Sequence, residues 1–126
     1  MAGKSRETNM KAGRLWIEDG VIHACVDVKE FDLEMAKETT EIGNEMISET
    51  GVNLLLIDLG ECKKISREAR KYMENISENP AVRKIVFLVS NPVTRVLGSF
   101  FIGIQNPKVP TKMLGKKEEA IKWLKE

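Results

Sequence analysis

Near the start of the chain, apolar residues recur at every second position, which is the period of a half-buried β-strand. The alternation spans residues 21–28, and Asp19-Gly20 before it is typical of a two-residue hairpin turn after residues 14–18. The expected core face consists of Ile22, Ala24, Val26 and Val28. The opposite face consists of Val21, His23, Cys25 and Asp27. The pattern predicts an antiparallel hairpin with one buried face.

Further along the chain, apolar residues recur instead with the period of amphipathic helices. The first predicted helix begins at Asp32, which can cap it, and ends at Gly51. The next begins at Ser66 and ends before Asn79-Pro80, and the last covers residues 116–125.

Between the helices lie apolar runs that are typical of strands. Residues 52–59 and 81–89 are continuous enough for central strands covered on both faces, and residues 112–114 form a short edge strand. The order predicts an α/β fold with a mixed sheet of about five strands and four helices. An antiparallel hairpin is followed by parallel β-α-β crossovers. We expect residues 1–12 to be a disordered tail and residues 13–126 to be a single domain.

The most informative segment is a strongly apolar helix over residues 92–105. Ser90 or Asn91 can cap it, and Pro92 suits the first helical position. Glycines at 98 and 103 suggest a close approach or local mobility, because glycine disfavours a helix. One helical face is expected to hold Val93, Val96, Leu97, Phe100, Phe101 and Ile104. This face could pack in the core, bind a lipid-like molecule or membrane surface, or pair with a second copy in a homodimer.

The composition excludes several classes of protein. The chain has 126 residues, of which 42% are hydrophobic and 31% charged, as in an ordinary globular domain. Its net charge of +1 argues against a nucleic-acid-binding protein. No apolar run is long enough to span a membrane, and no secretory signal is recognisable. We therefore expect a cytoplasmic protein, peripheral at the membrane if it binds lipid.

Candidate chemistry is sparse. Cys25 and Cys62 are far apart and are expected to be free thiols, and the single histidine, His23, completes no metal site with them. Asp58 follows a strand but has no evident catalytic partner, and no nucleotide, hydrolase or metal motif occurs. The sequence predicts no cofactor and no enzyme.

A basic segment precedes the helix that Ser66 caps. Parallel strands present ligands at their carboxyl ends, and this loop leaves such an end. The expected anion or headgroup site consists of Lys63, Lys64, Ser66, Arg67 and Arg95. Solvated surface charge is the alternative.

Three stretches, residues 54–59, 91–101 and 118–124, resemble the SpoIIAA-like family of the STAS domain superfamily, and the likeness runs from Gly13 to the end. The resemblance implies a non-enzymatic domain that binds apolar ligands or membranes. In STAS domains that antagonise anti-sigma factors, an Asp-Ser-Ser-Gly turn carries a phosphorylated serine that switches binding to a protein partner. Here residues 66–69 read Ser-Arg-Glu-Ala, so Ser66 is the one candidate acceptor in a turn that departs from that pattern.

Overall fold

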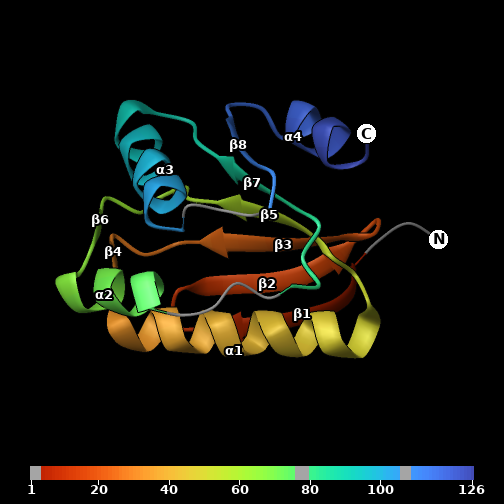
Figure 1. The fold of residues 1–126 in the computed structure, drawn as a ribbon, viewed down its shortest axis with the longest axis horizontal. Coiled ribbons are helices and arrows are strands. Elements are labelled where there is room, and N and C mark those ends of the chain that lie inside the picture. Colours follow the sequence, from red (N-terminus) through yellow and green to blue (C-terminus); the bar gives the residue numbers. More distant parts are fainter. Residues whose placement is uncertain (1–3, 76–79, 106–108) are drawn as a thin grey trace.

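The computed structural model describes the backbone of residues 4–75, 80–105 and 109–126, and the side chains of residues 7–72, 80–99 and 109–126 (Figure 1).

A six-stranded mixed sheet forms the centre of the fold, in the order β1-β2-β3-β5-β7-β8. Its strands are β1 (Lys4–Met10), β2 (Gly13–Glu18), β3 (Val21–Val26), β5 (Leu54–Asp58), β7 (Lys84–Leu88) and β8 (Thr111–Leu114). The first three pair antiparallel, and β3, β5, β7 and β8 pair parallel. Two short strands, β4 (Glu30–Phe31) and β6 (Lys64–Ile65), pair with each other beside this sheet. The predicted mixed α/β architecture is confirmed, with more strands than the five expected.

Four helices cover the two faces of the sheet unequally. They are α1 (Leu33–Thr50), α2 (Arg67–Asn75), α3 (Pro92–Gln105) and α4 (Lys117–Leu124). Buried residues of α1, α2 and α3 pack with one face, whereas Ala120 and Leu124 of α4 pack with Val21, Leu56 and Val86 on the other. Figure 1 shows α4 on the opposite side of the molecule from α1.

The residues predicted to begin and end helices and turns do so in the structure. The Asp32 carboxylate accepts a hydrogen bond from the backbone N–H of Met35 at 3.0 Å and caps α1. Gly51 ends this helix with a φ of 75°. Asp19 and Gly20 both have positive φ, 53° and 77°, as a tight hairpin turn requires.

The start of the chain corrects the sequence analysis. Instead of belonging to a disordered tail, Lys4–Met10 forms β1 at the edge of the sheet. Backbone pairing to β2 needs no apolar side chains, so the polar composition concealed this strand. The turn after it is tied to α1, because Lys11 donates its backbone N–H to Glu38 at 2.6 Å and its Nζ to Glu34 at 2.8 Å.

The β3 hairpin strand is also buried more fully than expected. Val21 and His23 were placed on a solvated face, yet they are only 1% and 3% exposed. The reason is α4, which covers Val21 from that side. His23 is further shielded by the Trp16 ring, which stacks on it at a centroid distance of 5.1 Å.

Candidate functional site

The N-terminus of α3 is fixed by reciprocal hydrogen bonds. The Asn91 side chain accepts from the backbone N–H of Thr94 at 3.0 Å, so Asn91 rather than Ser90 is the side-chain cap. In return, the Thr94 hydroxyl accepts the backbone N–H groups of Ser90 and Asn91 at 3.1 and 3.2 Å and donates to the Asn91 carbonyl at 3.1 Å. Thr94 is 1% exposed, so the network lies where α3 meets the body of the domain.

Gly98 allows α3 to approach the sheet closely. A Cβ at this position would lie 2.8 Å from Sδ of Met113 and 3.1 Å from Cγ1 of Val89. Leu97, next to Gly98, is buried in the same core cluster as Val89. The glycine that the sequence marked as a close approach therefore faces the domain's own sheet.

Two apolar side chains of α3 point outward instead. Val93 is 46% exposed and Val96 is 70% exposed. Leu97 was expected on the same face as both valines, but it is buried. The expected single stripe is therefore divided, because Thr94, Leu97 and Gly98 set the inward direction of the helix. Within the same stripe, the side chains of Phe100, Phe101 and Ile104 lie outside the described residues.

Helical geometry places the exposed valines on the flank of α3 away from β8. Gly98 and Ser99 approach Met113 of β8, with the Ser99 hydroxyl 3.8 Å from its Sδ. At about 100° per residue, Val96 lies nearly opposite Gly98 around the helix axis. α3 also contacts α2, and its buried Leu97 belongs to the same core cluster as Ala69 of α2, so both valines point away from the core.

Most of the predicted anion-binding residues lie on or next to β6 and α2. Lys63, Lys64 and Arg67 are exposed, and Lys64 lies 3.9 Å from Glu30 in a loose ion pair. The backbone of this segment is held in place, because the N–H groups of Lys63 and Lys64 donate to the Lys29 carbonyl at 2.8 and 3.1 Å. The cations therefore project from a fixed backbone.

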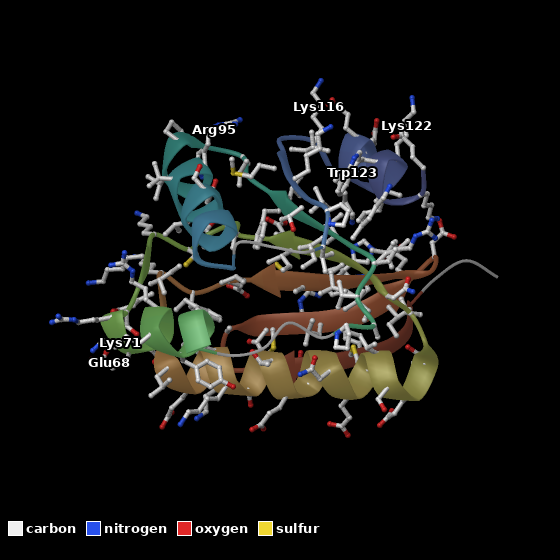
Figure 2. All side chains as sticks on the ribbon, viewed as in Figure 1. Glu68, Lys71, Arg95, Lys116, Lys122 and Trp123 are labelled. Atoms are coloured by element: carbon white, nitrogen blue, oxygen red, sulfur yellow. The ribbon has the colours of Figure 1, made fainter. Side chains whose placement is uncertain are left out.

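Ser66 acts as the N-cap of α2, as predicted. Its Oγ accepts the backbone N–H of Ala69 at 3.1 Å, and the side chain is half-buried. Arg95 is exposed on α3, and Figure 2 shows it at the outer side of that helix. Because β6–α2 and α3 follow the neighbouring parallel strands β5 and β7, the exposed apolar groups of α3 and the cations of β6–α2 lie toward the same end of the sheet. We name this region the amphipathic edge and define it by Lys63, Lys64, Arg67, Val93, Arg95 and Val96.

The remaining sequence candidates lie elsewhere. Asp58 accepts the backbone N–H of Gly60 at 2.9 Å, which is a turn interaction. Burial raises the pKa of both Cys25 and Cys62, and for Cys25 the neighbouring Asp58 charge raises the pKa further. Both thiols are therefore protonated and weakly nucleophilic at neutral pH.

His23 is a buried histidine on the α4 side of the sheet. Its Nδ1 has no hydrogen-bond partner, and burial, followed by the charge of Lys117, lowers its pKa. Among the described residues, no cluster of three or more His, Cys, Asp or Glu side chains is arranged to hold a metal ion.

Thr94 is the important residue that the sequence analysis overlooked. A threonine three residues after a capping asparagine is a signal for a reciprocal cap, and it could have been recognised. Its inward position also shows why the apolar stripe was misassigned.

Comparisons with known proteins identify the fold but do not indicate an activity. A crystal structure of an uncharacterised DUF3478-family protein with a SpoIIAA-like fold, from Shewanella loihica PV-4, matches with a TM-score of 0.59 and 12% identity. The match covers 98% of this chain and 92% of that protein. A protein of unknown function from Arthrobacter sp. FB24 is 25% identical over 85% of this chain and 93% of its own, but its TM-score of 0.33 is too low to inform the fold.

A search of curated proteins gave no match. Within the described residues, no helix has the length and hydropathy needed to cross a membrane. A family model matches residues 15–126, and the chain therefore belongs to the family described as Domain of unknown function (DUF7793).

Proposed function

We propose that this protein is a non-enzymatic, STAS-like binding domain of the SpoIIAA-like type. Its ligand is an anionic amphiphile, either a lipid-like molecule or a membrane surface, and the amphipathic edge contacts it. The observation that carries the proposal is the exposure of Val93 and Val96 on α3, which begins at the same end of the sheet as the cations of β6–α2.

The energetics favour a ligand with both an apolar and an anionic part. Covering the exposed surface of the two valines is worth about 3 kcal/mol in total at about 25 cal/mol per Å². Each lysine or arginine near an anionic surface adds about 1 kcal/mol. Neither contribution alone gives firm binding, so a purely apolar or purely anionic ligand would bind weakly. In the cell, we infer a cytoplasmic protein that is peripheral at the membrane.

The test is a titration with a monomeric anionic amphiphile, lysophosphatidylglycerol below its micellar concentration, with zwitterionic lysophosphatidylcholine as the comparison. Native mass spectrometry and calorimetry would report stoichiometry and affinity. We expect Val96→Ser to weaken binding about tenfold and Arg67→Gln about fivefold. The matched control is Lys122→Gln on α4, an exposed lysine far from Arg95 in Figure 2, which should bind as the wild type does.

Equal binding of both amphiphiles, or equal losses in Arg67→Gln and Lys122→Gln, would contradict the proposal. A doubled native mass without a ligand adduct would instead favour a homodimer through α3.

A second function, a protein-interaction switch, rests on Ser66. Its Oγ sits at the N-terminus of α2, next to Lys64 and Arg67, where a phosphate group would be stabilised by the helix dipole and by cations. In this alternative, phosphorylation of Ser66 changes the affinity for a protein partner. Incubation with a cognate kinase and mass measurement, with Ser66→Ala as the control, tests it. Absence of added phosphate on Ser66 would eliminate this function.

A further inference from the structure

Met113 fills a notch between α3 and the edge of the sheet. It lies on β8, the last strand in the sheet order, and its side chain is half-buried. A Cβ at Gly98 would lie 2.8 Å from its Sδ and 3.3 Å from its Cγ, so the thioether occupies the space that the glycine leaves free. The contact between α3 and β8 therefore depends on the size of the group at this sulfur.

A hydroxyl group of α3 lies beside the same sulfur. The Ser99 Oγ is 3.8 Å from Sδ of Met113 and 3.1 Å from the Arg95 carbonyl oxygen. The hydroxyl has one proton for these two acceptors, and the thioether is the weaker acceptor. Ser99 is exposed, so solvent and small solutes reach this side of the contact. An oxygen atom added to the sulfur would therefore compete with the Arg95 carbonyl for the proton of Ser99.

Other methionines provide comparisons within the same chain. Met46 of α1 is 0% exposed, so a solute cannot reach its sulfur while the domain is folded. Met10 is half-buried, and its Sδ accepts a hydrogen bond from the Thr39 hydroxyl at 3.5 Å. Met10 lies on β1 at the other edge of the sheet, and Thr39 belongs to α1. A chemical change at Met113 thus acts on α3, whereas the same change at Met10 acts on α1.

We propose that Met113 is an oxidation site and that its sulfoxide loosens α3 from the sheet. The co-reactant is a peroxide such as hydrogen peroxide. A lone pair of Sδ attacks one peroxide oxygen, the O–O bond breaks as the S–O bond forms, and the other oxygen leaves as water after proton transfer. The sulfur loses two electrons, and the peroxide gains them.

The position of the added oxygen explains its effect on the helix. It cannot point toward Gly98, because the sulfur already fills that space. It turns instead toward Ser99 and solvent, where it accepts the hydroxyl proton that the Arg95 carbonyl otherwise receives. The polar side chain then leaves the notch, and Gly98 loses the neighbour against which α3 packs.

This inference deepens the proposed function by adding regulation of the same site, and its binding step rests on that function. The close approach at Gly98 sets the direction in which Val96 points outward. Loosening of α3 removes the fixed position of the exposed valines, so the oxidised protein binds an amphiphile more weakly. The change is reversible, because methionine sulfoxide reductases restore the thioether.

The experiment exposes the folded protein to hydrogen peroxide and follows each methionine by peptide mapping and mass spectrometry. We expect Met113 to gain one oxygen while Met46 stays unmodified. Hydrogen exchange on the oxidised protein should become faster in peptides covering residues 92–99. The affinity for monomeric lysophosphatidylglycerol should fall about fivefold, which is less than the loss expected for Val96→Ser.

Two leucine variants provide the matched comparison, because leucine keeps most of the apolar volume of methionine and has no sulfur to oxidise. Met113→Leu removes the proposed site, and Met10→Leu removes the half-buried methionine at the other edge of the sheet. Peroxide should alter α3 exchange and amphiphile binding in Met10→Leu, as in the wild type, and alter neither in Met113→Leu. Circular dichroism before oxidation would establish that both variants are folded. Treatment with sulfoxide reductases should restore the oxidised proteins.

The outcomes separate this inference from the function on which it rests. Oxidation of Met113 no faster than that of Met46 would overturn the site. Unchanged exchange in α3 after oxidation of Met113, or an equal effect of peroxide on both leucine variants, would overturn its action on the helix. Faster exchange in α3 of a protein that binds no lysophosphatidylglycerol even when reduced would support the action on α3 and refute the proposed function.

Discussion

Replacing Thr94 by valine removes one hydroxyl group from the start of α3 and leaves the shape of the side chain almost unchanged. That hydroxyl accepts the backbone N–H groups of Ser90 and Asn91 and donates to the Asn91 carbonyl. Thr94 is 1% exposed, so the valine side chain can occupy the same space. The substitution therefore isolates the contribution of the cap from that of packing.

The magnitude follows from the groups that lose their partners. A buried donor without an acceptor costs about 1–3 kcal/mol, and two N–H groups are affected. Ser90 and Asn91 are exposed residues, so water can reach part of this turn and the cost lies toward the lower end. We expect Thr94→Val to lower the free energy of unfolding by about 2 kcal/mol. Asn91→Ala, which removes the reciprocal cap, should cost about 1 kcal/mol.

Urea unfolding followed by far-ultraviolet circular dichroism measures both changes. Thr94→Ser is the matched control, because it keeps the hydroxyl and loses a methyl group worth about 0.8 kcal/mol. The double variant of Asn91 and Thr94 should cost less than the sum of the single changes, since the two residues bond to each other. A Thr94→Val protein within about 0.5 kcal/mol of the wild type, or no more destabilised than Thr94→Ser, would refute the reasoning.

Three further predictions use the same unfolding assay. Gly98→Val should cost about 1–3 kcal/mol, because a larger side chain must displace its sheet neighbours. Gly43→Ala, with open space around its Cβ, should instead stabilise α1 by up to about 1 kcal/mol. Similar changes in stability for the two variants would contradict close packing of α3. The pKa of His23 is lowered in the folded state, so the unfolded chain takes up a proton first as the pH falls below 6.5, and stability should decline below that pH and not above it. His23→Phe should remove this part of the pH dependence, and an unchanged profile in the variant would argue against a role for His23. Gly13→Ala should cost about 3 kcal/mol or more, since Gly13 has a φ of 150° and its Cβ would clash with the Cys25 carbonyl oxygen; a folded protein of wild-type stability would show that this turn can rearrange.

The sequence was most informative where local chemistry decides the structure. Asp32 and Ser66 cap helices, and Gly51 ends one, through backbone groups only a few residues away. Their roles could therefore be predicted from the sequence. The strand β1 was missed because its stability comes from backbone pairing with β2, which leaves no apolar alternation to detect. The burial of Val21 was missed for a related reason, since it depends on α4, which lies far along the chain.

In the candidate site, features that could and could not be predicted from the sequence occur within a single helix. α3 has apolar residues around much of its circumference, so hydrophobicity alone could not decide which of them would face the sheet. Contacts distant in the sequence decided it. Gly98 permits close approach to Met113 and Val89, and that approach turns Val96 outward. A glycine that appears to weaken the helix therefore determines which apolar side chains remain exposed for a ligand. If this is correct, Gly98→Val should reduce amphiphile binding as well as stability, even though the glycine itself lies on the side of α3 away from the amphipathic edge.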